Sequence, residues 1–188
     1  MVSQPLRIRA SGRDVPADGM TIGEIQLRGN NVMLGYYNDP AATAAVSDGG
    51  WFRTGDLGVL HPDGYVEIRD REKDVIISGG ENITSIEVEQ ALASHPAVLE
   101  SAVVGLPDPE WGEAVVAYVE LRPGASATES ELVEHVKQRI ARFKAPRRVF
   151  FGDLPKTATG KIQKFKLRGS GFDQSRKEAP LEVEPSPP

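Results

Sequence analysis

Two stretches with helical spacing of apolar residues, separated by β-branched runs, limit most strongly what this 188-residue chain can fold into. The stretches are TSIEVEQALASHP and TESELVEHVKQRI. Both open on the spacing of a capping box, with Thr84 before Glu87 and Thr128 before Glu131. In the second stretch, one helix face carries four apolar residues, Leu132, Val133, Val136 and Ile140. Each stretch therefore predicts a short helix with one buried face.

The segments around these helices predict strands. VLESAVVGL, EAVVAYVEL and RRVFF are β-branched or aromatic runs of strand length, and DVIISGGENI is an apolar run that enters a Gly-Gly loop. The resulting order is β-α-β-β-α-β. It predicts a small α/β domain over residues 73–168, with a three-stranded sheet, flanking helices and a β-hairpin.

Residues 1–72 have a different pattern. TIGEIQLRG and YVEIR are typical of short strands, and NDPAAT predicts a turn into a short helix. The chain as a whole is therefore expected to be an α+β protein with a β-rich first part. Residues 169–188 lack an apolar period and end rich in proline, which predicts a disordered tail.

Composition excludes several classes of function. The formal net charge is −5 and the pI is about 5.3, whereas nucleic-acid-binding domains tend to have a pI above about 9. The chain has no cysteine, which excludes disulfides and a catalytic thiol, and its three histidines are scattered without metal-ligand spacing. No apolar run reaches the ~20 residues that span a bilayer. We therefore expect a cytoplasmic protein with no metal site, no transmembrane segment and no nucleic-acid partner.

The stretch WFRTGDLG contains a candidate ligand-binding carboxylate, Asp56, which lies between Gly55 and Gly58. An exposed carboxylate accepts two hydrogen bonds, and a vicinal diol such as that of ribose offers two donors. The alternative is that Asp56 only shapes a turn, as Gly-Asp sequences often do.

The stretch IRDREKDVIISGGENI joins the two parts of the chain. Its alternating charges at residues 70–74 are consistent with a solvated linker, or with a hinge that has a functional arginine beside it. The pair Gly79-Gly80 has two interpretations as well. It is typical of a plain turn, and it also lets a backbone approach a narrow ligand closely.

The stretch PKTATGKIQKFKLR, residues 155–168, holds five basic side chains. It fails the phosphate-binding pattern GxxxxGK[ST], and a nucleic-acid site would need interleaved aromatics where only Phe165 is present. Two interpretations are left open. The charges form a solvated face, or a mobile loop delivers one lysine, Lys161, to a phosphate.

Taken in order, these motifs resemble the C-terminal part of the adenylate-forming (AMP-binding) enzymes, and most closely acyl-CoA synthetases. The resemblance runs from about residue 23 to residue 168. It rests on GEIQLRGNNVMLGYYNDPAAT, GGWFRTGDLG, DGYVEIRDREKDVIISGGENI, LPDPEWGE, ARFKAPRRVFF and LPKTATGKIQKFKLR. It implies that residues 1–72 are the last β-rich portion of a large domain and that residues 73–168 are the complete small C-terminal domain.

The resemblance also implies roles for single residues. Asp56 would hold the ATP ribose hydroxyls, Arg71 would contact the nucleotide, and Lys73 would be the hinge. Lys161 would be the catalytic lysine of adenylation and an ATP ligand, with the other charges of its stretch mostly solvated. Three residues would line the pantetheine passage for CoA: Gly79, Gly80 and Trp111.

The implied reaction has two steps. A carboxylic acid, with a fatty acid expected, reacts with ATP to give acyl-AMP, and the small domain then rotates so that CoA takes the acyl group. Mg²⁺ is expected with ATP, but this chain shows no ligands for it. The phosphate loop and acyl pocket of the family do not occur in these 188 residues. We therefore expect the chain to be inactive alone, and three interpretations are left open: a fragment that lacks its N-terminal half, the product of a split gene, or a degraded gene.

Two alternatives to a CoA ligase are left open, the first within the same superfamily and the second from a different class. One is an adenylation domain or acyl-AMP ligase that serves a carrier protein, although GGENI and Thr159-Gly160-Lys161 favour the CoA ligase. The other is a non-catalytic module that keeps a nucleotide-binding or CoA-binding face.

Overall fold

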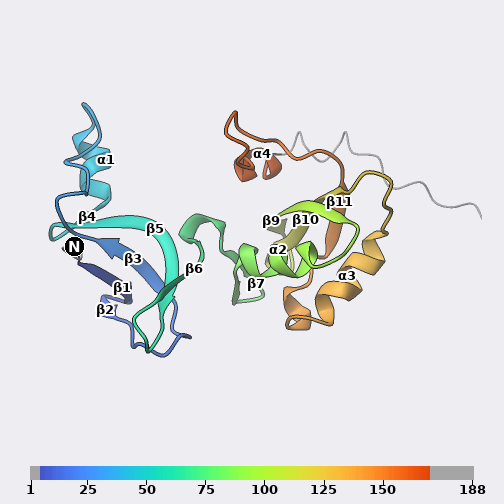
Figure 1. Cartoon of the computed structure of the whole chain (residues 1–188), viewed down its shortest axis with the longest axis horizontal. Helices are drawn as coiled ribbons and strands as arrows, with labels where there is room; N and C mark the ends of the chain where they lie inside the picture. Colours follow the sequence, from blue (N-terminus) through green and yellow to red (C-terminus); the bar gives the residue numbers. More distant parts are fainter. Residues whose placement is uncertain (1–4, 170–188) are drawn as a thin grey trace, which may run out of the picture. The chain divides into compact units, whose positions relative to one another are not determined.

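The computed structural model describes residues 5–169, and the chain divides into two compact units, Met1–Lys73 and Asp74–Pro188 (Figure 1). The predicted disordered tail lies, from residue 170 onward, outside the described residues. A short 3₁₀ helix, Glu72–Asp74, spans the boundary between the units, and the predicted hinge residue Lys73 is its middle residue. Each unit has its own sheet.

The first unit is a six-stranded antiparallel sheet with one short helix. The strand order is β2-β1-β3-β5-β4, with β6 also paired to β5. Asp39 caps the helix by accepting a hydrogen bond from the Ala42 amide, and proline occupies its first turn. The elements are β1 Leu6–Ala10, β2 Arg13–Asp14, β3 Gly23–Leu27, α1 Pro40–Ala45, β4 Ser47–Asp48, β5 Trp51–Leu60 and β6 Val66–Arg71.

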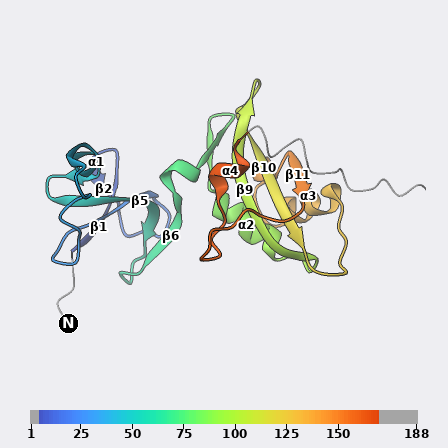
Figure 2. The same ribbon diagram turned by 90° about the horizontal axis from the view of Figure 1, so that it is seen from above.

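The second unit has a five-stranded sheet with helices. β9 and β10 form a long antiparallel hairpin, and β11 adds to β10 in parallel (Figure 2). The β7–β8 hairpin joins the start of β10 through the pair Gly112–Ser78. The elements are β7 Ile76–Ser78, β8 Glu81–Ile83, α2 Ser85–Ala93, β9 Val98–Asp108, β10 Gly112–Leu121, α3 Glu129–Lys137, β11 Arg148–Phe151 and α4 Lys164–Leu167.

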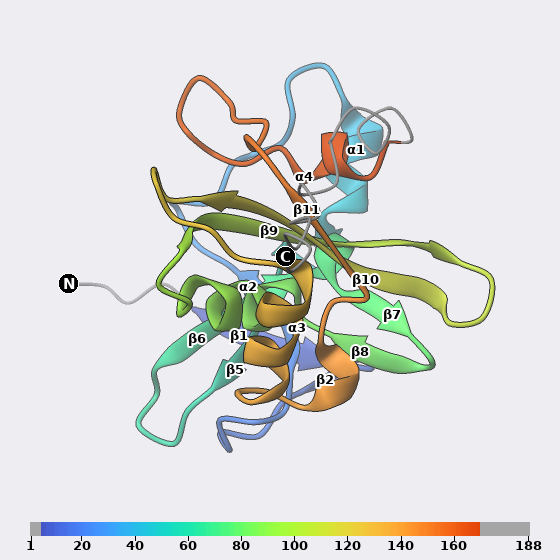
Figure 3. The ribbon, with the colours of Figure 1, turned by 90° about the vertical axis from the view of Figure 1, so that its right-hand side faces the viewer.

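The sheet of the second unit buries both of its faces. Alternate residues of β9 and β10 point to opposite sides, as the period of a strand requires. Val103, Ala117 and Val119 pack with α2 and α3 on one side. Tyr118 packs with Leu154, Leu167 and other residues of the C-terminal segment on the other side. Figure 3 shows α2 and α3 on one side of β9 and β10, with the loop before α4 on the other. The PKTATGKIQKFKLR stretch therefore packs against the sheet.

The sequence predicted most of these elements correctly. The mixed α+β class, the strands of the second unit and the capping box of α3 are all present; Thr128 accepts from the Glu131 amide and Glu131 accepts from the Thr128 amide. The predicted β-hairpin is not separate from the three-stranded sheet, because it pairs with β10 and extends the sheet to five strands. Ile140 lies beyond the end of α3 but still packs against the core.

The capping box predicted for α2 was wrong. Thr84 is the N-cap residue, but its side chain accepts no capping hydrogen bond. The Glu87 carboxylate instead forms an ion pair with the ammonium of Lys144, at 2.6 Å. Oε2 of Glu87 also accepts a long hydrogen bond from the Thr84 hydroxyl, at 3.5 Å, and Lys144 stabilises this carboxylate more strongly than a neutral amide would.

The stability of the second unit is expected to fall as the pH falls below about 6.5, the ordinary pKa of histidine, toward the lower folded-state pKa of His135. Desolvation, with the charges of Arg139 and His95 as further causes, lowers the pKa of His135, whose Nε2 lies 2.8 Å from Ser94 Oγ. Because the folded state disfavours the charged imidazole, His135 contributes stability above its unfolded pKa and loses it as protons bind.

His135→Gln is therefore expected to lose less stability than the unmodified chain between pH 7.5 and pH 5. The free energy of unfolding would be followed through hydrogen exchange of β10 amides, which report on the second unit. His61→Gln, in the first unit, is the matched control and should keep the full pH response of β10. Equal pH slopes for His135→Gln and the unmodified chain would contradict the prediction.

Candidate functional site

The structure brings Asp56 and Arg71 into contact. Asp56 lies on β5 and pairs in register with Arg71 on β6, and the Arg71 Nε atom is 2.9 Å from Asp56 Oδ1. The Asp56 side chain is 29% exposed and that of Arg71 is 58% exposed, so both can reach a ligand in solvent. Asp56 belongs to a strand, so the interpretation that it only shapes a turn was wrong. The pair offers a carboxylate and a guanidinium on one sheet surface.

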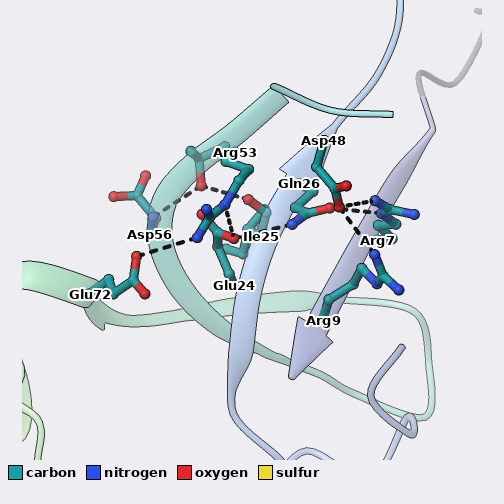
Figure 4. A network of polar contacts seen from close by, with 10 residues as sticks. Arg7, Arg9, Glu24, Ile25, Gln26, Asp48, Arg53, Asp56 and Glu72 are labelled. Atoms are coloured by element: carbon teal, nitrogen blue, oxygen red, sulfur yellow. Dashed lines mark hydrogen bonds and ion pairs between the residues drawn. The ribbon is translucent and has the colours of Figure 1, made fainter. Parts of the chain in front are cut away.

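A polar network lies beside this pair on the same sheet (Figure 4). The Arg53 Nε atom is 2.8 Å from the buried carboxylate of Glu24, which raises the pKa of Arg53. Gln26, also buried, donates a hydrogen bond to Glu24 and accepts one from Arg7. Buried polar groups in such a satisfied chain hold one another in place. Arg53 and Glu24 were missed as site-supporting residues, because their contact joins strands 29 residues apart.

Lys161 directly follows a tight turn. The Thr157 amide donates to the Lys161 carbonyl at 2.8 Å, and the Lys161 amide donates to Thr157 Oγ1 at 3.1 Å. The Gly160 amide donates to the Thr157 carbonyl, and Gly160 has a φ of +83°, which glycine adopts at little cost. The Lys161 side chain is exposed. The turn thus presents an ammonium group to solvent on a defined backbone.

Three of the four other charges of this stretch form ion pairs, so the prediction that they are mostly solvated was wrong. The Lys156 ammonium forms ion pairs with Glu100 at 2.6 Å and Glu120 at 3.4 Å, and the hydrogen bond to Glu100 is the main cause that raises the pKa of Lys156. Two further pairs hold α4, Lys164–Glu89 at 2.8 Å and Arg168–Asp74 at 2.7 Å. Ion pairs therefore hold the chain on both sides of Lys161.

Gly79, Gly80 and Trp111 also come together, at the turn of the β7–β8 hairpin. The Gly79 amide donates to the Trp111 carbonyl at 2.9 Å. A Cβ atom on Gly79 would lie 2.7 Å from Trp111 Cε3, so only glycine fits against the indole. Gly80 faces open space, and the Arg147 guanidinium lies 4.5 Å from the centre of the indole ring. The backbone of the hairpin turn therefore lies directly against an exposed aromatic side chain.

Within the second unit, the hairpin and the Lys161 turn occupy different sides. The hairpin joins the edge of the sheet next to β10, whereas the turn belongs to the segment that covers the face opposite α2 and α3. Figure 3 shows the loop before α4 away from the β7–β8 hairpin. A single small unit thus carries two separate candidate surfaces.

Within residues 5–169, no helix is long and apolar enough to cross a membrane. In the same range, no group of three or more His, Cys, Asp or Glu side chains could hold a metal ion.

Comparison with known proteins gives one consistent result. Residues 87–161 match the family described as AMP-binding enzyme C-terminal domain. The chain is 55% identical over 162 residues to the 2-methylpropanoate–CoA ligase of Humulus lupulus, covering 84% of this chain and 29% of that protein. It is 50% identical over 169 residues to 4-hydroxybutyrate–CoA ligase 2 of Metallosphaera sedula, covering 90% of this chain and 31% of that protein.

The structure is also similar to solved structures. ATP-bound MatB from Rhodopseudomonas palustris matches with a TM-score of 0.84 and 37% identity, over 92% of this chain and 35% of that chain. The chain therefore spans about 30% of the length of the curated relatives it matches.

Proposed function

Because this chain is homologous, over most of its length, to the C-terminal part of the adenylate-forming (AMP-binding) enzymes, we propose that it works as that part of an acid–CoA ligase. The matched relatives are acid–thiol ligases named for their acids and CoA. The proposed reaction joins a carboxylate to ATP, releases pyrophosphate, and transfers the acyl group from acyl-AMP to the CoA thiol. The remaining two thirds of the relatives' length would supply the rest of the site.

The observation that carries this proposal is the contact between Asp56 and Arg71. Both were predicted as ligands of one nucleotide, and they lie 2.9 Å apart on neighbouring strands. A carboxylate accepts hydrogen bonds from both hydroxyls of a ribose, and an arginine binds ribose or phosphate oxygens. The pair can thus hold two groups of one ATP molecule.

In the first step, Lys161 would act at the α-phosphate. Its ammonium would neutralise the charge that develops on the phosphoryl oxygens as the carboxylate oxygen attacks and pyrophosphate leaves. The anchored turn supports this role, because fixed donors stabilise a transition state without having to reorganise.

In the second step, the hairpin surface would replace the lysine surface. The small unit would rotate about Lys73, which lies at the end of the first unit. The Gly79-Gly80 turn and Trp111 would then line a passage for the pantetheine arm, whose thiol attacks the acyl-AMP carbonyl and displaces AMP. A glycine turn lets the backbone approach such a narrow chain closely.

The identity of the acid is the finer part of the proposal. The names 2-methylpropanoate–CoA ligase and 4-hydroxybutyrate–CoA ligase favour a short carboxylic acid over the fatty acid expected from the sequence. Mg²⁺ would accompany the ATP phosphates, and the roles proposed for this chain belong to its own side chains and to the backbone of the Gly79-Gly80 turn. The cytoplasmic location stays a prediction.

The experiment that tests the proposal replaces the matched segment of the 2-methylpropanoate–CoA ligase with this chain. The resulting hybrid protein is the grafted ligase. It is expected to form 2-methylpropanoyl-CoA from the acid, ATP and CoA, whereas the same ligase truncated before the segment is not. A folded grafted ligase that forms neither acyl-AMP nor thioester would overturn the proposed function.

Asp56→Asn is expected to raise the KM for ATP of the grafted ligase about 10- to 100-fold, because hydrogen bonds to a charged group contribute about 1.5–3 kcal/mol. The amide keeps one acceptor oxygen but loses the charge that binds Arg71 and the ribose. Asp63→Asn is the matched control, because the Asp63 carboxylate accepts a hydrogen bond from the Tyr65 amide of its own turn. An unchanged KM for ATP in Asp56→Asn would exclude this carboxylate as the ribose ligand.

A further inference from the structure

The ladder between β3 and β5 is interrupted beside Asp56. Glu24 pairs with Leu57 and Gln26 pairs with Arg53, so a step of two residues on β3 corresponds to four on β5. Thr54, Gly55 and Asp56 therefore form a bulge opposite Ile25. Bulges re-aim side chains and are frequent next to active sites.

The Thr54 side chain bridges this bulge. Its Oγ1 atom accepts a hydrogen bond from the Asp56 amide at 3.0 Å and donates one to the Ile25 carbonyl at 2.8 Å. The hydroxyl thereby satisfies the Asp56 N–H and the Ile25 carbonyl, which in a regular ladder would form hydrogen bonds between β3 and β5. Without the hydroxyl, these two partly buried groups would lack hydrogen-bond partners, and the backbone would favour a different path.

Residues within and beside the bulge also fix its path. Gly55 has a φ of +71°, and a Cβ there would meet nothing within 4 Å, so glycine is needed for its backbone conformation and not for space. Arg53, before the bulge, is held by Glu24 at 2.8 Å. Asp56, the last residue of the bulge, pairs with Arg71 on β6, at the end of a β5–β6 ladder whose register shifts between Leu57 and Gly58. Figure 4 shows Arg53, Ile25 and Asp56 around this point.

We propose that Thr54 is a positioning residue for the Asp56 carboxylate. The bulge sets the path of β5 up to the Asp56–Arg71 pair, at which the β5–β6 ladder ends, and Thr54 holds the bulge in this form. The expected consequence, that loss of the hydroxyl weakens binding of the ATP ribose, rests on the proposed function. The role of Thr54 in positioning Asp56 does not depend on that function.

The test uses the full 188-residue chain and three variants. Thr54→Val removes both hydrogen bonds and keeps the shape of the side chain, whereas Thr54→Ser keeps the hydroxyl. Thr43→Val is the matched control, because the Thr43 hydroxyl also accepts an amide, that of Tyr36, and donates to a carbonyl, that of Asp39.

The first readout is the NMR signal of the Arg71 Nε–H group, followed while Asp56 is titrated through its carboxyl ¹³C signal. In the unmodified chain, Thr54→Ser and Thr43→Val, the Arg71 signal is expected to shift with protonation of Asp56. In Thr54→Val this coupled shift is expected to be lost. A coupled shift that survives in folded Thr54→Val would overturn the inference.

Two further measurements separate the possible failures. If Thr54→Val does not fold, the unmodified chain is decisive: a slowly exchanging Thr54 hydroxyl proton with an NOE to the Asp56 amide supports the inference, and a rapidly exchanging one without that NOE overturns it. In the grafted ligase, Thr54→Val should raise the KM for ATP about tenfold, as for one or two lost hydrogen bonds, and Thr54→Ser should restore it. An inactive grafted ligase with an intact coupled shift would count against the proposed function only.

Discussion

Replacing Lys161 by alanine is expected to slow the adenylation half-reaction of the grafted ligase by about 10²- to 10³-fold, as the loss of one preorganised charge-stabilising group does in other enzymes. The lysine follows a turn that Thr157 closes and that ion pairs of Lys156 and Lys164 hold in place. The variant removes only the exposed part of the side chain, so the turn should persist. Carboxylate-dependent ATP–pyrophosphate exchange measures the loss.

Lys166→Ala is the control for this experiment. Lys166 belongs to the same basic stretch and is exposed on α4, so the variant removes the same charge from the same segment. Exchange should stay within about twofold of the unmodified grafted ligase, as for most surface substitutions. If both lysine variants lost exchange to the same degree, the stretch would act through its total charge and not through Lys161.

Replacing Gly79 by alanine is expected to slow transfer of the acyl group to CoA by about 10²-fold, the effect of a displacement of about 1 Å in a reacting group. The new Cβ would lie 2.7 Å from Trp111 Cε3, so the indole or the hairpin must move. The φ of +61° also disfavours any side chain there. Single-turnover thioester formation from preformed acyl-adenylate and CoA measures the effect.

Gly124→Ala separates backbone strain from loss of the hairpin surface. Gly124 has a similar φ, +75°, and a Cβ there would contact nothing within 4 Å. The variant should destabilise the second unit by an amount comparable to the strain at Gly79, while thioester formation stays unchanged. Equal loss in the two glycine variants would mean that reduced stability, and not the Trp111 contact, explains the effect.

The helix and strand pattern of the second unit could be predicted because its signals are local. Thr128 and Glu131 are three residues apart and make the capping box that their spacing predicts. The same spacing at Thr84 and Glu87 failed, because Lys144 competes for Glu87 from 57 residues away. A short-range sequence pattern therefore predicts a capping box correctly unless a charged residue far away in the sequence binds one of its side chains more strongly.

The candidate site was predictable only in part, for the same reason. The motif order pointed to Asp56 and Arg71, but the motifs alone do not show that these residues pair across β5 and β6. The bulge at Thr54 depends on the register of β3 against β5, which no local pattern sets. The anchors Lys156 and Arg168 looked like solvated charges because their acidic partners are 36 or more residues away.

In the proposed function, one small unit serves two half-reactions through two separate surfaces. The most direct test measures, in the grafted ligase, the ratio of the adenylation rate constant to the thioester-forming rate constant in Lys161→Ala and Gly79→Ala. We expect opposite changes: the ratio falls in Lys161→Ala and rises in Gly79→Ala. If both variants slowed both half-reactions to the same extent, so that the ratio stayed constant, the two surfaces would not be functionally separate and the claim would be contradicted.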